Sequence, residues 1–367
     1  MGRGIAEGQL IEAGLLPNPE IDTTWLTPPV GPVQIAGEAN ALFDLSEALI
    51  TRGPRKDRAR TRMEQVAWEV ADKEWRLANE TRQAFLGLVY EDEAISLNEK
   101  QKEISNKTLS VLKARHARGA ASELDVLVAE TELANLERQA KQLEGARKLA
   151  MQGLNRSIGL PPNHDTRLQK DEKPLAYTPP QGEVEQLAEE LRSRRFDLVA
   201  AEKDYLVAER DLQIACRKQF PRVSLGPTSE GGDGERNGRW GLGLAFEIPF
   251  FNRNQGEIVV RTAEREQKRR SYEANLQSAR AEFHAAWTGM ATLDAELKVF
   301  FAEVAPRLER SLELMGKAFD KGDVDILQVL LLQEKALQSQ REILERLREF
   351  HRARIEVEGS LGPKRSK

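Results

Sequence analysis

The sequence predicts a mainly α protein with a small β part, built from two equivalent halves. Three observations predict this fold class. Long stretches without proline mix apolar and charged residues, as very long helices do. Short segments alternate between apolar and polar residues, which is the period of a β-strand. Landmarks of the first half of the chain recur in the second half at one constant offset.

The composition favours long helices and argues against several classes of function. Of the 367 residues, 31% are charged and only 6% are aromatic, which is typical of coiled coils. Acidic and basic residues are interspersed and the net charge is −4, so no nucleic acid binding is expected. The one cysteine, Cys216, excludes an intramolecular disulfide. No run approaches the ~20 apolar residues of a membrane-spanning helix.

The first repeat covers residues 1–158. In chain order we expect the end of a helix over 1–16, strands over about 20–27 and 36–50, and helices over 54–118 and 122–158. Gly119 separates the two helices. At ~1.5 Å per residue the longer helix approaches ~100 Å, which is too long for a compact domain.

An irregular connector, residues 159–182, is rich in proline, aspartate and lysine. The second repeat, residues 183–362, then follows, and residues 363–367 form a tail. In this repeat we expect a helix over 183–218, strands over about 221–228 and 239–249, and helices over 254–321 and 323–361.

The internal duplication rests on pairs of residues that are all 203 positions apart: Phe43 and Phe246, Gly53 and Gly256, Gly119 and Gly322, Gly159 and Gly362. Apolar residues also recur every seven positions in both repeats. The seam of the second repeat is Val329, Ala336, Ile343, Phe350 and Val357. That of the first is Val126, Leu133, Ala140 and Leu154, with Arg147 as the exception. Seven is the coiled-coil period, so the long antiparallel helices are expected to pack along their length.

The duplication also predicts a longer N-terminal helix than the sequence contains. The helix over 183–218 should have a counterpart 203 positions earlier, and only its last part is present before Pro17. We therefore expect a further ~20 helical residues and an export signal upstream of Met1.

The strand over 239–249 has one apolar face and one face of small or charged residues. Its apolar face carries Trp240, Leu242, Leu244, Phe246 and Ile248, and Phe43 and Leu45 occupy the equivalent positions of the first repeat. A closed barrel in lipid satisfies such strands because it leaves no edge unpaired. Four strands cannot enclose a lumen, whereas twelve strands from three copies can.

Two motifs carry a resemblance to a known family. The sequence LLPNPEI lies at 15–21 and IPFFNRNQGEI lies at 248–258. Together with the duplicated strand and helix order, they resemble the TolC-like outer membrane factors over about residues 10–362. The second motif is similar to the heavy-metal branch, of the CzcC and CusC type.

The resemblance implies a homotrimer with a twelve-stranded barrel in the bacterial outer membrane and an α-helical conduit in the periplasm. The connector would lie in the equatorial region of that conduit. The implied partners are the lipid bilayer, a periplasmic adaptor (membrane fusion protein) and an inner-membrane transporter of the RND type. The implied function is passive export of small solutes, with heavy-metal cations as one candidate cargo. No enzymatic activity, cofactor or bound metal is implied.

The resemblance also places the periplasmic tip, where the adaptor would dock, at the two turns between long helices. The tip residues are Gly119, Ser122, Leu124, Asp125, Gly322, Asp323, Val324, Asp325, Leu327 and Gln328. Glycine permits the positive φ of such a turn, and Ser122 and Asp325 are suitable N-caps. Many relatives carry acidic residues at the positions of Gln328 and Leu331. Here Asp125, Asp323 or Asp325 would have to supply that charge.

The junction between barrel and helices is expected at Gly53, Asn252, Arg253, Asn254 and Gly256, where the asparagines favour turns.

Two other classes of function compete with the channel interpretation. A soluble coiled-coil scaffold fits the high charge, but the apolar strands would then be aggregation-prone edges in water. A cytosolic enzyme is the other alternative, but the sequence contains no candidate pair of nucleophile and base. The histidines and methionines are scattered, so no metal site is predicted.

Overall fold

The computed structural model describes residues 2–26, 36–167, 175–231, 239–321 and 326–364. It is mostly helical, with four strands, as the sequence predicts. The chain divides into two compact units, the first comprising Met1–Asp72 and Arg195–Ser278 and the second Lys73–Arg194 and Ala279–Lys367. Each unit contains parts of both repeats, so the compact units differ from the repeats that the sequence defines.

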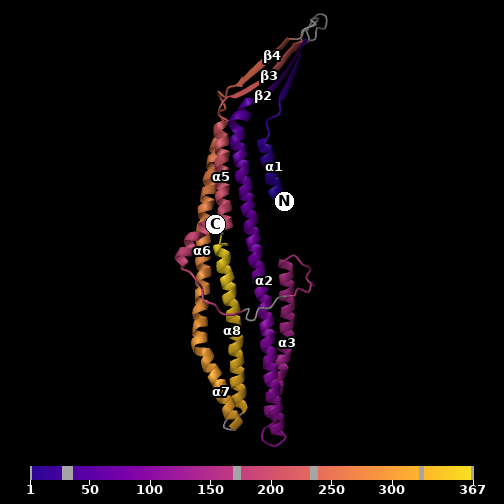
Figure 1. The fold of residues 1–367 in the computed structure, drawn as a ribbon, viewed down its shortest axis with the longest axis vertical. Coiled ribbons are helices and arrows are strands. Elements are labelled where there is room, and N and C mark those ends of the chain that lie inside the picture. The colour runs from indigo at the N-terminus through magenta and orange to yellow at the C-terminus, as the bar shows by residue number, and fades with distance from the viewer. Residues whose placement is uncertain (1, 27–35, 168–174, 232–238, 322–325, 365–367) are drawn as a thin grey trace. The chain divides into compact units, whose positions relative to one another are not determined.

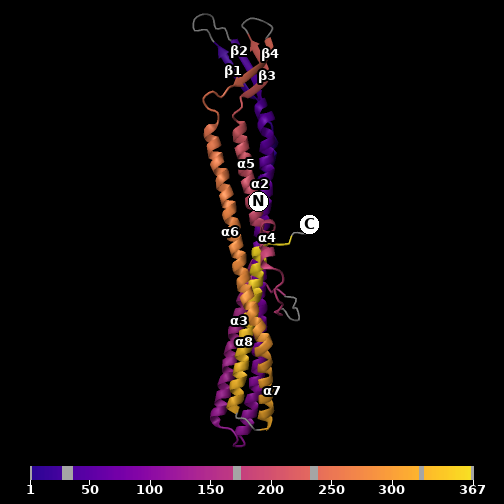
Figure 2. The ribbon, with the colours of Figure 1, turned by 90° about the vertical axis from the view of Figure 1, so that its left-hand side faces the viewer.

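The first unit contains the β-sheet. Its strands are β1 (Glu20–Leu26), β2 (Ala36–Asp44), β3 (Arg222–Gly231) and β4 (Arg239–Glu247). They form one antiparallel sheet in the order β1-β2-β3-β4 (Figures 1 and 2). The central pairing, β2 with β3, joins a strand of the first repeat to a strand of the second. In its register Phe43 lies opposite Leu225, and on the other side of β3 Leu225 lies opposite Leu244.

The second predicted strand ends earlier than expected, at Asp44 rather than at residue 50. The π-helical turn η1 (Glu47–Thr51) follows, so Leu45 lies outside the sheet. Side chains that bond to the backbone explain this end. The Asp44 carboxylate accepts the N–H of Glu47 at 2.9 Å, and Ser46 Oγ accepts the N–H of Val223 at 2.6 Å. Such bonds favour a turn over continued strand pairing.

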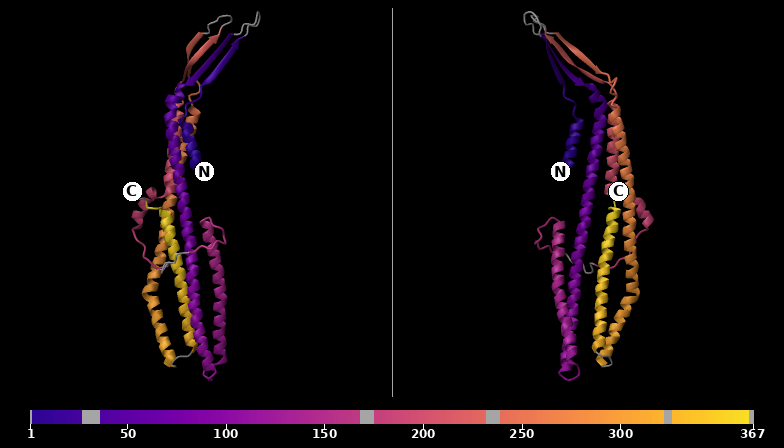
Figure 3. Two further views of the ribbon diagram at one scale, coloured as in Figure 1. Left: turned by 45° about the vertical axis from the view of Figure 1, so that its right-hand side comes forward. Right: turned by 180° about the vertical axis from the view of Figure 1, so that it is seen from behind.

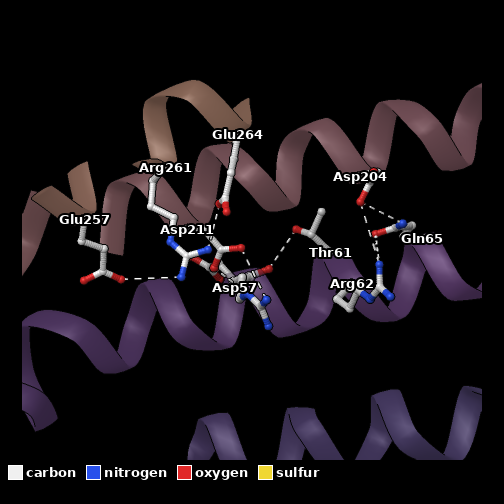
Figure 4. Close-up of polar contacts among 10 residues, drawn as sticks. Asp57, Thr61, Arg62, Gln65, Asp204, Asp211, Glu257, Arg261 and Glu264 are labelled. Atoms are coloured by element: carbon white, nitrogen blue, oxygen red, sulfur yellow. Dashed lines mark hydrogen bonds and ion pairs between the residues drawn. The ribbon is translucent and has the colours of Figure 1, made fainter. Parts of the chain in front are cut away.

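Helices α1 (Gly2–Gly14), α5 (Phe196–Arg217) and the first part of α2 (Arg52–His116) also belong to the first unit. Helix α6 (Gln255–Val299) begins there. Charged side chains link α2 to α5 (Figure 4). Arg58 binds Asp211 at 2.8 Å, and Gln65 donates to Asp204 at 3.1 Å. Because Gln65 is buried, its hydrogen bond satisfies a polar group that water cannot reach.

The second unit is helical in its described part. Besides the later part of α2, it contains α3 (Glu123–Ser157), α4 (Val184–Arg194), α7 (Ala305–Lys321) and α8 (Ile326–Leu361). Two helical hairpins result, α2 with α3 and α7 with α8, and the helices of each lie side by side (Figures 1 and 3). In none of the described helices is there an apolar stretch of the length that crosses a membrane.

Two of the expected long helices are interrupted. The helix predicted over 183–218 is divided at Arg195, which has the extended backbone angles φ −69° and ψ 122° and serves as the N-cap of α5. The helix predicted over 254–321 contains the π-helical turn η2 (Phe300–Val304) between α6 and α7. Pro306, which has no N–H to donate, lies two residues beyond this turn. A π-helical turn keeps the neighbouring backbone hydrogen-bonded, so the chain stays helical across it.

The core of the second unit follows the predicted seam. Phe350 and Val357 are buried with Phe283, Met290 and Leu297 of α6. Val329 and Ala336 are also buried. The connector closes this core, since Tyr177 packs on Phe350 and donates its hydroxyl to Asp294 at 2.6 Å. Burial, together with that carboxylate, raises the pKa of Tyr177 to about 12.

The structure confirms the internal duplication. Strands β2 and β4 end at Asp44 and Glu247, which are 203 positions apart. Helices α2 and α6 begin at Arg52 and Gln255, also 203 positions apart. The repeats differ after the second strand, where the first forms η1 and the second runs on without helix to Gln255.

Replacing Leu297 with alanine tests the core of the second unit. Leu297 is 1% exposed, so the change leaves a cavity and is expected to lower the free energy of unfolding by about 2–5 kcal/mol. The control Leu149→Ala alters a leucine that is 69% exposed and is expected to cost less than about 1 kcal/mol. Urea unfolding followed by circular dichroism measures both. Equal losses would contradict the assigned core.

Candidate functional site

The turn between α2 and α3 has the backbone geometry that the sequence predicts for the tip. Gly119 has a φ of +73°, the left-handed conformation that glycine adopts without strain. Its N–H donates to the carbonyl of His116 at 2.8 Å, and the N–H of Ala120 donates to that of Arg115 at 2.9 Å. These bonds satisfy carbonyls at the C-terminal end of α2.

Ser122 is the N-cap of α3, as expected, and forms a capping box with Asp125. Ser122 Oγ accepts the N–H of Asp125 at 3.1 Å, while the Asp125 carboxylate accepts the N–H of Ser122 at 2.9 Å. These bonds lower the pKa of Asp125 from its ordinary value. The tip of the first repeat therefore carries a fixed, ionised carboxylate at neutral pH.

The second tip is only partly described. Gly322, Asp323, Val324 and Asp325 lie outside the described residues, and α8 begins directly after them at Ile326. Leu327 lies in the first turn of that helix, and the side chain of Gln328 is exposed. The roles predicted for residues 322–325 therefore remain predictions.

A small apolar cluster, which the sequence did not single out as a unit, lies close to the first tip. It contains Leu109 and Leu112 of α2, Ala129 of α3 and Val329 of α8, with Met315 of α7 packed against it. It draws on all four helices of the two hairpins. Leu124 is 67% exposed and stands outside the cluster.

The sheet presents one apolar face. Residues that are directly paired across antiparallel strands share a face of the sheet. The register of β3 and β4 places three apolar pairs on one face: Phe246 with Val223, Leu244 with Leu225, and Leu242 with Pro227. Phe43 of β2 joins them through Leu225. These large side chains are exposed, Trp240 and Leu242 by 80% and 81%. Ile248, just past the end of β4, is exposed as well.

The opposite face of the sheet is polar. It brings together Arg222 with Glu247, Asn40 with Thr228, and Glu230 with Arg239. Arg222 and Glu247 form an ion pair at 3.6 Å. Glycines 241 and 243 belong to this face of β4, which therefore has little side-chain volume. The two faces of the sheet therefore differ in polarity, and one of them exposes large apolar side chains.

The junction residues of the second repeat form a tight turn before α6. Asn254 adopts a φ of +59°, and its side chain donates to the carbonyl of Ala215 at 2.9 Å. Its N–H donates to the side chain of Asn252 at 3.0 Å, and the N–H of Arg253 donates to Gln255 at 2.7 Å. Gly256 lies in the first turn of α6, and Gly53 lies at the start of α2. The asparagines therefore do form turns, as predicted.

The described residues include no group of three or more histidine, cysteine, aspartate or glutamate side chains arranged to hold a metal ion. Cys216 is exposed and unbonded. The notable features of the described chain are therefore its two-faced sheet and its capped helical tip.

Part of the chain matches a protein family, and the chain is similar to several known proteins. Residues 187–363 match the model of the outer membrane efflux protein family. The pyoverdine export outer membrane protein OpmQ of Pseudomonas aeruginosa is 28% identical over 229 residues, which cover 60% of this chain and 48% of OpmQ. The cobalt-zinc-cadmium resistance protein CzcC of Cupriavidus metallidurans is 24% identical over 370 residues, 97% of this chain and 84% of CzcC. The match to OpmQ thus spans about half of that relative.

Solved structures share the fold over nearly the whole chain. CusC superposes with a TM-score of 0.76 at 17% identity, covering 99% of this chain and 87% of CusC. The outer membrane protein VceC of Vibrio cholerae superposes with a TM-score of 0.72 at 18% identity, covering 98% of this chain and 90% of VceC.

Replacing Ser122 with alanine tests the capped tip. Loss of the N-cap bond is expected to cost about 0.5–2 kcal/mol and to speed hydrogen exchange in the first turn of α3. Acid should act the same way, because a carboxyl with a lowered pKa stabilises the fold above its ordinary value of 3.8 and stops doing so as the pH falls through its folded pKa. Hydrogen exchange with mass spectrometry measures both effects. Ser110→Ala, in the exposed interior of α2, is the control and should leave that exchange unchanged.

Proposed function

We propose that this chain, which has a TolC-like fold and matches the outer membrane efflux protein family over residues 187–363, is the outer membrane channel of a tripartite efflux system. The observation that carries the proposal is the two-faced sheet, with exposed Trp240 and Leu242 on the apolar side and ion-paired Arg222 and Glu247 on the other. Lipid can cover the first face, and a water-filled lumen can solvate the second. The chain would act as a passive conduit rather than an enzyme.

The proposed assembly is a homotrimer. Among the described residues, β1 and β4 are the outer strands of a four-stranded sheet, so the outward edge of each has no neighbouring strand in that part of the chain. Open edges do not persist in the hydrocarbon region of a membrane, because unpaired backbone groups cost several kcal/mol each. Pairing β1 of one copy with β4 of the next removes both edges, and three copies give twelve strands, enough to surround a lumen.

The helices would continue the channel in the periplasm of a Gram-negative bacterium, because no described helix is apolar enough to enter the bilayer. The proposed partners there are a periplasmic adaptor and an RND-type pump of the inner membrane. The adaptor would dock at the tip residues: Gly119, Ser122, Leu124, Asp125, Gly322, Asp323, Val324, Asp325, Leu327 and Gln328. Exposed Leu124 beside the ionised Asp125 supports this choice, since apolar anchors within a polar rim characterise docking surfaces.

The proposed cargo is a small solute that the pump delivers. The names of two relatives indicate different cargoes, pyoverdine for OpmQ and cobalt, zinc and cadmium for CzcC. The tip bears on this choice, because Gln328 and Leu331 are neutral and exposed. Any attraction of cations would fall to Asp125 and to Asp323 or Asp325. We favour heavy-metal cations because the match to CzcC covers more of this chain than the match to OpmQ.

Deletion of the gene tests the cargo. Under the proposed function, the deletion strain loses tolerance to zinc, cobalt or cadmium and regains it when the full chain is supplied on a plasmid. Tolerance to dyes, detergents and copper is measured beside it. Sensitivity to dyes and detergents alone would contradict the metal assignment, and unchanged tolerance to every compound would contradict export.

Replacing Leu242 with arginine tests the lipid-facing side of the sheet. An arginine near the middle of the lipid-facing band is expected to cost about 2–4 kcal/mol, so fewer heat-resistant trimers should reach the outer membrane. Asn40→Arg places the same side chain on the polar face of β2 and should leave trimer yield near that of the unaltered chain. Electrophoresis of unheated outer membrane fractions measures the yield. Equal yields for the two variants would contradict the assignment of the faces.

A further inference from the structure

An apolar cavity lies in the second unit between the two helical hairpins. Its volume is about 480 Å³, within the range of sites that hold drug-sized molecules. Aliphatic side chains from four helices line it, among them Ile104 of α2, Leu127 and Val128 of α3, Leu312 of α7 and Leu337 of α8. Most of its surface is apolar, so a ligand that fills it would need apolar groups.

The charges in this cavity have one sign. Among its described lining residues the charged ones are Glu132 of α3 and Glu334 of α8. Burial raises the pKa of Glu132, and the nearby carboxylate of Glu334 raises it further. Both effects show that negative charge is poorly stabilised here. A cation in the cavity would relieve the repulsion between the two carboxylates.

Arg341 of α8 is a basic residue near Glu132, and its positive charge acts to lower the pKa of Glu132. It is not one of the residues that line the cavity. Its guanidinium donates instead to two amide oxygens, to Gln101 at 2.9 Å and to Gln139. Arg341 therefore links α8 to α2 and α3 without neutralising the cavity by a direct ion pair.

Gln101 also lines the cavity, and it is 4% exposed. Its Oε1 accepts from Arg341, which orients the amide. Its Nε2 has no hydrogen-bond partner in the described part of the chain and is buried too deeply for a molecule in the cavity to reach it. The polar groups that a ligand would meet are therefore mainly the two carboxylates.

We propose that this cavity binds a small, apolar organic cation. Glu132 and Glu334 neutralise the cationic centre, and the aliphatic walls contact its hydrocarbon groups. The site goes beyond the proposed transport function, because binding can be measured on the isolated protein whether or not the protein is a channel.

Two probes of the same shape and opposite charge test the sign of the site. Tetraphenylphosphonium is an apolar cation, and tetraphenylborate is its anionic counterpart. Isothermal titration of the purified full chain in detergent should show saturable binding of the cation alone, after subtraction of the heat measured with detergent. Comparable binding of the anion would overturn the proposal, because it would show apolar partitioning without charge recognition.

Variants locate the site. Glu132→Gln should weaken tetraphenylphosphonium binding about tenfold, whereas Glu137→Gln on the exposed side of α3 should not change it. Val128→Trp should fill the cavity and reduce binding similarly, whereas Leu149→Trp, on the same helix outside the cavity, should have no effect. Circular dichroism verifies that each variant is folded. Unchanged affinity in folded Glu132→Gln and Val128→Trp would overturn the proposal.

Discussion

The pairing of β2 with β3 is the constraint on which the rest of this structure depends. It joins the two repeats in one sheet, and its register fixes which side chains share a face. A shift by one residue would move every large apolar side chain to the polar side. The fit is tight at Gly226, where an added Cβ would lie 1.8 Å from the carbonyl oxygen of Ala41. Only glycine allows the two backbones to approach so closely.

The helices meet a different requirement, because they must pack along their length without a single compact core. The structure combines two devices. Apolar seams with buried residues such as Phe350 hold the second unit, while ion pairs such as Arg58 with Asp211 link α2 to α5 in the first. An ion pair at a partly exposed site contributes at most about 1 kcal/mol, so the polar links fix register more than they add stability.

Much of this architecture could be predicted from the sequence, since it rests on periodicity. Alternation predicted the faces of β4, the seven-residue step predicted the buried seam, and glycine and serine predicted the turn at Gly119 and Ser122. Other features depend on contacts between distant residues. The end of β2 depends on Ser46 bonding to Val223, and the break at Arg195 has no local glycine or proline. The cavity exists only because two hairpins, far apart in sequence, meet around Gln101 and Glu132.

The duplication has a consequence for how charge is distributed around the proposed ring. Asp125 and Gln328 stand 203 positions apart, so they are counterparts in the two repeats. A mutation in one repeat alters only every second position around a circle of copies. The first repeat keeps a carboxylate where the second has an amide, while the second carries its aspartates at 323 and 325. The mouth of the ring would therefore alternate two different arrangements of charge. Gene duplication thus lets a symmetric assembly carry two chemistries on one circumference.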